Sequence, residues 1–584
     1  MTFSRRRPAW GRSASRGLAL LLGLLLGGSA AAFAADGPRA ATAAAPSQAA
    51  QKPGRAAIAS ANFHATNAGL EVLARGGNAF DAAVAVASTL SVVEPESSGI
   101  GGGFMAVLRR AGDGREVFID ARETAPAAVD SKDYLKPDGT PNRDTALNGP
   151  LSAGIPGEPA GLAWLAKHYG KLPLKDSLAP AIRIARDGFE PDSRLREAIA
   201  DRADDLRRWP ASVAKYLPGG KPPAEGAAWR DPDQAHTLEL LAERGADGFY
   251  RGEVAQKLVA AVRAAGGNWS AADLAGYQVK ERAPISVDYR GYRIVTAPPP
   301  SSGGVAVAEI LNILRGFDLG KLDRAHRIHL VIEAMRRAFR DHNDYLGDPD
   351  FVKMPLEMLL SPYYADGLRQ SILPDKATPS SMLPYTAAAD PGMHTTHFSI
   401  IDKDGNMIAV TSTVNYTLGS TFVAAGTGVL LNDEMDDFAL VAGKPNVYGL
   451  LGSEANAPKP GKRMLSSMTP SLVIGADRSA VIGSPGGSTI ITQVLEGILA
   501  FIDGKSATAI AAQKRFHHQF MPDRVDVEEG VFDPATAESL KRMGYELHPR
   551  QSWGFMNVVT WDHKTNTLDA ASDPRRPSGL GKVQ

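Results

Sequence analysis

An abrupt change of pattern at residue 395 constrains the fold of this chain more than any other feature. Residues 375–394, DKATPSSMLPYTAAADPGMH, are rich in Pro, Ala and Ser, which is typical of an exposed and mobile loop. Directly afterwards HFSII and MIAVTSTV flank the turn DKDGN, and this arrangement predicts a β-hairpin over residues 397–414. Thr395 and Thr396 therefore stand where a loop becomes a core strand.

Strands and helices are expected in both halves of the chain. Two helices should end before Pro95, followed by a Gly-rich turn and two strands around the turn GDG. Residues 157–270 and 326–346 have helical apolar spacing, and the His and Arg residues of the second segment indicate a solvated face. The last third should be strand-dominated, with one helix at 489–502 and strands that include GVLLN at 428–432. This mixture predicts a layered α/β sandwich.

Composition excludes several classes of site. The absence of Cys rules out disulfides, thiolate zinc sites, Cys nucleophiles and iron–sulfur ligation. Lys plus Arg (64) balances Asp plus Glu (64), so no net field recruits nucleic acid or anionic lipid, and a small molecule or peptide is favoured as partner. The 12 His residues lack metal-ligand spacing, and SSGIGGGF fails the dinucleotide fingerprint because Phe104 occupies its third Gly position. We therefore expect no metal and no cofactor.

Residues 1–34 have the features of a signal peptide. A basic start precedes an apolar stretch, and Ala32-Phe33-Ala34 forms a small-residue cleavage site. The apolar stretch is shorter than the ~20 residues that a membrane span needs, which argues against an anchor. We expect a periplasmic or secreted protein with no membrane attachment in its mature form. The Sec and twin-arginine routes both remain open, and residues 35–55 should form a flexible lead-in.

Thr395 fits the requirements of an N-terminal nucleophile. Such an enzyme needs a Thr, Ser or Cys that opens a buried strand, a preceding segment that can be cut, and two backbone N–H donors for the oxyanion. The α-amine released by the cut then serves as the base, since its pKa of about 7.7–8.0 lies near working pH. A Thr-Thr pair alone is an ordinary β-strand choice. Further motifs decide the question.

Those motifs closely resemble the γ-glutamyltranspeptidase (glutathione hydrolase) family of N-terminal nucleophile hydrolases, through nearly the whole chain after residue 35. They include VVEPESSGIGGGFMAVL, IDARETAPAA, PPPSSGGVAVAEILNIL, LLNDEMDDF, KRMLSSMTPSLV and GSPGGSTIITQV. The resemblance implies a four-layer αββα sandwich formed jointly by both halves of a self-cleaved chain. It implies a cut between His394 and Thr395, which yields a large subunit (35–394) and a small catalytic subunit (395–584) that stay together as a heterodimer.

The resemblance also assigns site residues. Thr395 would be the nucleophile, supported by the hydroxyl of Thr413. A zwitterionic glutamyl group needs one cationic and one anionic binding group. At the position of residue 434, members of the family have either Gln or Glu. The implied oxyanion donors are Gly486 and Gly487, the α-carboxylate ligands are Arg122, Ser466 and Ser467, and the α-ammonium ligands are Asn415, Glu434 and Asp437. Tyr448 matches a tyrosine of the lid loop, residues 440–461, that covers the bound glutamyl group.

The implied activity is transfer of a γ-glutamyl group from glutathione and related compounds to water, an amino acid or a dipeptide. Cephalosporin acylases and poly-γ-glutamate depolymerases share the fold and the processing, so they are the alternatives. Arg122 with Asp437 argues against an acylase, because that pair recognises a free amino acid end, and a lid argues against a long polymer. An inactive binding protein is disfavoured because every expected catalytic position is filled.

Overall fold

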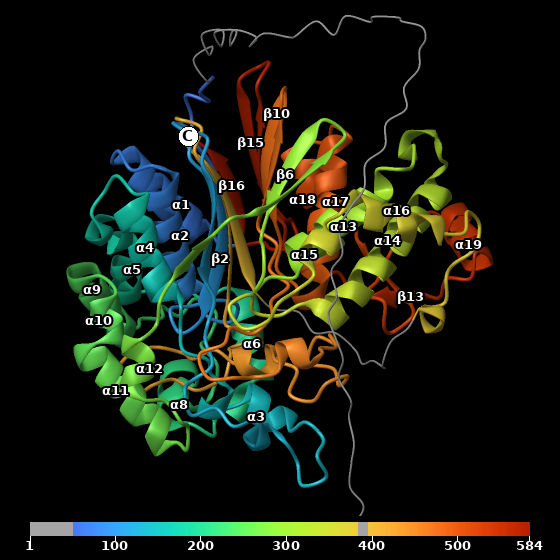
Figure 1. Ribbon diagram of the computed structural model, residues 1–584. Coiled ribbons are helices and arrows are strands. Elements are labelled where there is room, and N and C mark those ends of the chain that lie inside the picture. The colour runs from blue at the N-terminus through green and yellow to red at the C-terminus, as the bar shows by residue number, and fades with distance from the viewer. Residues whose placement is uncertain (1–50, 384–394) are drawn as a thin grey trace, which may run out of the picture. The chain divides into compact units, whose positions relative to one another are not determined.

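The computed structural model describes residues 51–383 and 395–584 (Figure 1). The expected signal peptide, residues 35–50 of the lead-in, and His394 lie outside these residues. Within the described part of the chain, no helix combines the length and apolar character needed to cross a bilayer.

The first sheet contains the predicted hairpin at its centre. All neighbouring strands are antiparallel. Its seven strands run in the order β16 (Leu580–Val583), β1 (Ala57–Ser60), β7 (Thr396–Ile401), β8 (Met407–Thr413), β2 (Gly103–Arg109), β3 (Glu116–Ala121) and β4 (Lys280–Arg282). One sheet therefore contains strands from both sides of residue 395, and β1 lies between two strands that follow this residue.

The hairpin prediction is confirmed. β7 pairs with β8 from Thr396 opposite Ser412 to Ile401 opposite Met407, and Gly405 turns the chain with a φ of 89°. Every residue of both strands is buried, because layers cover both faces of the sheet. The two flanking strands around GDG (β2 and β3) are confirmed as well.

A second sheet of six strands stacks against the first, and a small third sheet lies apart. The second runs β15 (Thr567–Ser572), β14 (Asn557–Asp562), β10 (Arg478–Gly483), β9 (Ser471–Gly475), β6 (Tyr292–Thr296) and β5 (Ile285–Tyr289). The third is formed by β11 (Phe516–His517), β12 (Val525–Glu528) and β13 (Leu547–Arg550).

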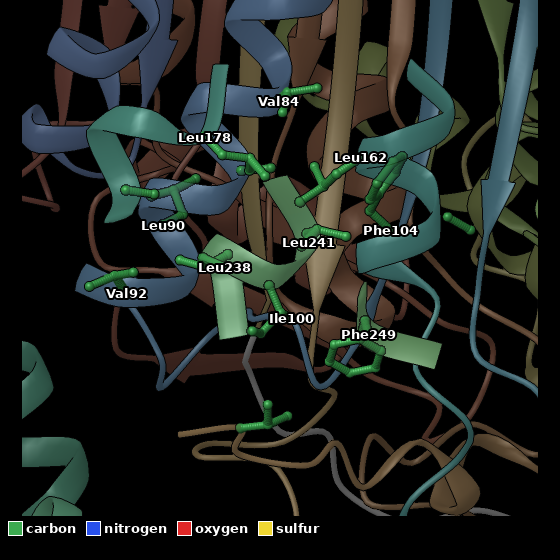
Figure 2. Packing of buried hydrophobic residues seen from close by; sticks show 14 of the residues in the cluster. Val84, Leu90, Val92, Ile100, Phe104, Leu162, Leu178, Leu238, Leu241 and Phe249 are labelled. Atoms are coloured by element: carbon green, nitrogen blue, oxygen red, sulfur yellow. The ribbon is translucent and has the colours of Figure 1, made fainter. Parts of the chain in front are cut away.

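One helical layer covers the outer face of the first sheet. Figure 2 shows Val84, Leu162 and Leu178 from these helices around Phe104 of β2. α2 begins at a capping box, in which Asn78 and Asp81 bond each other's backbone N–H, and it ends directly before Pro95 as predicted. The main helices of this layer are α1 (Phe63–Ala74), α2 (Ala79–Val93), α4 (Glu158–His168), α5 (Leu174–Asp187), α9 (Pro232–Arg244) and α11 (Gly252–Ala264).

The other helical layer covers the second sheet, and a separate core joins the two sheets (Figure 1). That core includes Met105 and Val107 of β2 together with Val481 of β10. The helices are α13 (Gly303–Leu314), α14 (Arg324–Tyr345), α17 (Ile490–Ile502) and α18 (Ala507–Ala511). The order of layers is therefore helix, sheet, sheet, helix, which confirms the αββα sandwich.

Shorter helices complete the described chain. They are α3 (Arg143–Leu147), α6 (Ser193–Asp201), α7 (Ala203–Leu206), α8 (Pro210–Tyr216), α10 (Asp247–Tyr250), α12 (Ala271–Ala275), α15 (Leu356–Leu359), α16 (Pro362–Gln370) and α19 (Pro534–Arg542). Residues 157–270 are mostly helical, as expected. The last third, in contrast, holds α18 and α19 beside the one helix predicted.

The prediction that the His and Arg residues of α14 form a solvated face is wrong. Arg336 and Arg337 are buried and both pair with Glu333 on the same helix. The reason is that α14 lies between α13 and the third sheet, where Ile328 and Ile332 pack against Val525 and its neighbours. Tertiary packing thus covers a face that the residue types alone mark as polar.

Two further expectations are corrected. Residues 428–432 do not form a strand, since only an isolated bridge joins Leu430 to Val423. The loop at 375–383 is not exposed throughout: Ala377 and Ser380 are buried, and their N–H groups bond to Met543 O at 2.7 Å and Asp523 Oδ2 at 2.7 Å. Backbone hydrogen bonds to distant segments thus hold this loop against the body.

Candidate active site

Thr395 and Thr413 meet at the open end of the central hairpin. Because Thr396 pairs with Ser412, the residues just beyond this pair, Thr395 and Thr413, lie opposite one another. The Thr395 hydroxyl donates to Thr413 Oγ1 at 3.2 Å, and Thr413 Oγ1 accepts from Asn415 N at 2.7 Å. The Thr396 hydroxyl instead donates to Glu94 Oε2 at 2.7 Å, a structural contact. The hairpin thus directs the Thr395 hydroxyl to Thr413 and the Thr396 hydroxyl to Glu94.

The backbone at Thr395 is strained. Its φ is 130°, in a region that β-branched residues rarely adopt. Such conformations persist only where the surrounding structure holds them, and they gather at functional sites. Thr395 is also buried, at 6% exposure.

The Gly-rich turn before β2 lets two backbones approach the site closely. A Cβ on Gly102 would lie 2.0 Å from Thr413 O, and one on Gly101 would lie 1.9 Å from Leu430 O. Only glycine fits such contacts. SSGIGGGF therefore serves close packing beside Thr413.

A second glycine turn, Gly486-Gly487, faces Thr395 between β10 and α17. The φ values are 136° and 57°, and a Cβ on Gly486 would lie 2.6 Å from both Gln493 Nε2 and Thr489 Oγ1. Neither N–H of this pair bonds to a described residue. Two unpaired N–H groups just before a helix form a ready site for developing negative charge.

Gln493 of α17 holds this turn in place. Its Nε2 donates to Pro485 O at 2.9 Å and to Thr489 Oγ1 at 2.9 Å, while its Oε1 accepts from the Ser484 hydroxyl at 2.7 Å. The sequence analysis missed Gln493: the residue lies inside the motif GSPGGSTIITQV, but only Gly486 and Gly487 of that motif were assigned a role.

Arg122 follows β3 and is fully buried beside carboxylates. Its Nη1 lies 2.5 Å from Glu434 Oε2 and 3.4 Å from Glu123 Oε2, and its Nη2 donates to Asp437 Oδ2 at 2.5 Å. Its Nε and Nη2 also donate to the carbonyls of Met464 (3.3 Å) and Leu465 (3.2 Å). The guanidinium is thereby fixed in one orientation.

The charges around Arg122 do not cancel. Burial opposes the charge on Arg122, but Glu434, Glu123 and Asp437 outweigh it and raise the pKa of Arg122. Burial raises the pKa of Glu434 well above its usual range and also raises the pKa of Asp437, although Arg122 lowers both. Burial raises the pKa of Glu123 to about 7. One cation among three carboxylates leaves room for a second cation, such as an ammonium group.

One cavity brings most of the predicted residues together. It has an empty volume of about 570 Å³, part of which is open to solvent. Its lining includes Thr395, Thr413, Gly487, Arg122, Asn415, Glu434, Asp437, Ser466, Ser467 and Tyr448. Gly486 lines an adjoining cavity that also contains Thr395.

The loop 440–461 forms one wall of this cavity. Tyr448 is buried, and its hydroxyl donates to Asn415 O at 2.7 Å. Asn415 Nδ2 in turn donates to Asp433 O at 2.9 Å. The tyrosine thus ties the loop to the residue that follows the hairpin.

The sequence analysis also missed three lining residues. Asn446 and Asn456 donate to Asp437, at Oδ1 (3.1 Å) and O (2.7 Å), and so fix its position. His342 lines the cavity from α14, and burial lowers its pKa to about 4, so it is neutral. Asn446 and Asn456 lie in the lid sequence, where only the tyrosine was singled out.

The arrangement suits acyl transfer by a threonine. A hydroxyl and a clamp with both charge signs line one cavity, and the Gly486-Gly487 turn lies where this cavity meets the adjoining one. Among the described residues, no group of three or more His, Cys, Asp or Glu could hold a metal ion.

Comparison with known proteins agrees with this chemistry. The chain is 42% identical over 536 residues to the glutathione hydrolase proenzyme of Pseudomonas sp. (strain A14), covering 90% of this chain and 93% of the relative. It is 40% identical over 536 residues to the glutathione hydrolase proenzyme of Escherichia coli (strain K12), covering 90% and 91%.

The fold also has solved counterparts. The crystal structure of cephalosporin acylase from Bacillus halodurans superposes with a TM-score of 0.79 at 30% identity, over 93% of this chain and 98% of that chain. The family model described as Gamma-glutamyltranspeptidase matches residues 65–583. With a hairpin threonine, a glycine turn and a charged clamp in one cavity, this chain belongs to the γ-glutamyltranspeptidase family.

Proposed function

We propose that this chain is an autoprocessing γ-glutamyltransferase and glutathione hydrolase with Thr395 as its nucleophile. The observation that carries the proposal is the cavity in which the Thr395–Thr413 hydroxyl pair and the glycine turn face Arg122 and its surplus of carboxylates. The names of the relatives point to the same activity.

Maturation would begin with an attack by the Thr395 hydroxyl on the carbonyl of His394. The peptide C–N bond breaks as the new C–O ester forms, and the nitrogen leaves as the α-amine of Thr395. Water then hydrolyses the ester, which gives a carboxylate at His394 and regenerates the hydroxyl. The products are a large subunit, 35–394, and a small subunit, 395–584, which remain a heterodimer.

Catalysis would use the same hydroxyl a second time. The free α-amine, with a pKa of about 7.7–8.0, accepts its proton as Oγ1 attacks the γ-glutamyl carbonyl. The N–H groups of Gly486 and Gly487 bind the oxyanion, and Thr413 orients the nucleophile. The amine of the donor leaves with a proton, and water or the amine of an amino acid or dipeptide resolves the ester.

The clamp would recognise the amino acid end of the donor. Arg122 binds the α-carboxylate with Ser466 and Ser467, while Asn415, Glu434 and Asp437 bind the α-ammonium. Tyr448 covers the bound group and limits access of water. Residues 1–34 would direct export to the periplasm or the exterior and be removed.

The nucleophile is tested with Thr395→Ala. Wild-type protein should give two fragments that meet between His394 and Thr395, by intact mass and N-terminal sequencing, and should hydrolyse γ-glutamyl-p-nitroanilide. The variant should stay one chain without activity. Thr396→Ala is the matched control and should be cut normally. An uncut but active wild type would refute the mechanism.

Acylase activity is the second candidate, because the acylase from Bacillus halodurans shares the fold. A glutaryl side chain lacks the α-ammonium group, so it would leave Arg122 as the partner that Glu434 and Asp437 share, with their second negative charge uncompensated. We expect kcat/KM for a glutaryl-cephalosporin to be at least about a hundredfold below that for glutathione, since each buried unpaired charge is strongly unfavourable.

A further inference from the structure

A second cavity meets the first at Thr395. It has an empty volume of about 890 Å³ and is lined by Thr395, Gly486, Arg194, Glu96 and Phe555 among others. Gly487 lines the first cavity and Gly486 the second. The reacting turn therefore lies on the boundary between two chambers.

This boundary fixes how a donor can lie. A carbonyl held by both glycine N–H groups has two substituents, and they must extend to opposite sides. If the clamp around Arg122 holds the glutamyl group in the first cavity, the amine side of the scissile bond extends into the second. The leaving group of the donor and the incoming amine of an acceptor would both occupy this second chamber.

Arg194 lines the second cavity, and the N–H groups of its guanidinium have no hydrogen-bond partner among the described residues. It projects from α6 with its guanidinium 4.4 Å from the centre of the Phe555 ring. It donates no hydrogen bond to any described residue, and its nearest carboxylate contact is Nε to Glu96 Oε1 at 3.9 Å. Its side chain is 31% exposed. A planar cation with free N–H donors, stacked on a ring at the edge of a cavity, suits a carboxylate.

Arg194 lies among carboxylates but forms no close ion pair with them: the shortest contact is 3.9 Å. Glu96 is engaged by Arg576, whose Nη2 lies 3.0 Å from Glu96 Oε1 and 2.9 Å from Glu94 Oε1. Burial lowers the pKa of Arg194, and Arg576 lowers it further. Glu197 and Asp201 are exposed on the same face of α6 and line the same cavity. They would oppose a ligand with more than one negative charge.

We propose that the second cavity binds the leaving group and the acceptor, and that Arg194 pairs there with the free carboxylate of an amino acid or dipeptide. This inference rests on the proposed function. It makes Arg194 a residue that determines specificity for amines bearing one carboxylate, such as the cysteinylglycine part of glutathione.

The test compares two donors that differ only at that carboxylate: glutathione and its glycinamide analogue. Wild type should favour glutathione by about tenfold in kcat/KM, the order expected of one charge-assisted hydrogen bond. Arg194→Met keeps an apolar stem over Phe555 but removes the charge, and should abolish the preference. Arg194→Lys should retain part of it. With Gly-Gly as acceptor, Arg194→Met should raise the acceptor KM by a similar factor.

Two controls separate the inference from the proposed function. γ-Glutamyl-p-nitroanilide has no carboxylate on its leaving group, so its hydrolysis should be unchanged in Arg194→Met; absence of this hydrolysis in wild type would instead refute the proposed function. Arg196→Met removes a charge from the same helix, where Arg196 bonds to Pro191 O, outside the cavity, and should keep the preference. Arg194→Gln repeats the charge removal with a polar side chain. A preference for glutathione that survives in both Arg194→Met and Arg194→Gln would overturn the proposal.

Discussion

At the scale of single residues, the surplus of carboxylates around Arg122 is the most informative feature. Arg122 contacts Glu434, Asp437 and Glu123 while fully buried. Removing the only cation of such a group leaves buried charges uncompensated, which destabilises a fold by about 3–5 kcal/mol. A loss of activity in an Arg122→Ala variant could therefore come from misfolding or from lost binding of the donor, and the two causes would not be separated.

Arg122→Lys separates these effects. Lysine keeps the positive charge, so the chain should still fold and cut itself, but a point charge cannot replace a planar fork. We expect kcat/KM for γ-glutamyl-p-nitroanilide to fall by roughly tenfold to a hundredfold, consistent with the loss of one charged hydrogen bond. Arg143→Lys, which alters a pair with Asp436 outside the cavity, should leave it unchanged. Failure of Arg122→Lys to be cut would make Arg122 structural.

The pH dependence of donor binding follows from the same group. Burial raises the pKa values of Glu434 and Asp437, so one carboxylate should become protonated well above the usual carboxyl range near 4. The substrate ammonium keeps its charge there, so the donor KM should rise as the pH falls through the raised pKa. Glu434→Gln should flatten this rise. A donor KM independent of pH down to about 5 in wild type would contradict this account.

At the scale of elements, the turn before α17 shows how a helix can set catalytic geometry. Gln493 fixes Pro485 and Ser484 on one side and Thr489 on the other. The Thr489 hydroxyl and N–H also donate to Gly486 O, at 2.7 Å and 3.2 Å, so these contacts together set the direction of the Gly486 and Gly487 N–H groups.

Gln493→Leu should therefore lower kcat more than it changes KM. We expect a loss of about tenfold to a hundredfold, the scale on which small misplacements act. Self-cleavage should slow as well, because it needs the same donors. Thr492→Val, which removes bonds to Thr489 O and His517 but none to Ser484 or Pro485, is the control. A variant with normal kcat and a lowered Tm would assign Gln493 to stability alone.

The sequence predicted elements well where a local pattern decides them. The hairpin at β7 and β8, the capped α2 and the helix α17 follow from periodicity and turn residues. It failed where packing decides. Arg336 and Arg337 have the residue type of a surface but are buried against Glu333, and Leu430 forms only an isolated bridge with Val423 in place of a strand.

The candidate site could be predicted only in part, because some of its residues belong to recognisable motifs and others do not. Motif order identifies Thr395, Arg122 and Gly487, all of which lie in one cavity. Their roles stay predictions. Arg194 comes from a segment with no motif, and Gln493 lies inside a motif in which only the two glycines were assigned a role. The folded chain brings both residues to Thr395 and its glycine turn.

At the scale of the whole molecule, the proposed cut falls inside an interleaved sheet. β1 from before the cut lies between β16 and β7 from after it, and β8 pairs with β2. Neither piece can therefore close the first sheet alone.

We expect the two fragments to remain one particle after cleavage. They should co-elute in gel filtration under native conditions and separate only in denaturant, because parting them breaks four strand pairings and exposes both cores. The uncut Thr395→Ala chain should elute at the same volume. A small fragment eluting alone from active protein would contradict this arrangement.

The strained φ of Thr395 has one more consequence. This torsion exists only while a peptide bond joins Thr395 to the residue before it, so the cut abolishes the angle together with its strain. Rejoining the ends would have to restore both, although the sheet keeps the new amine close to where it was made. Maturation should therefore be irreversible. Fragments kept for days at neutral pH should show no religated chain by intact mass.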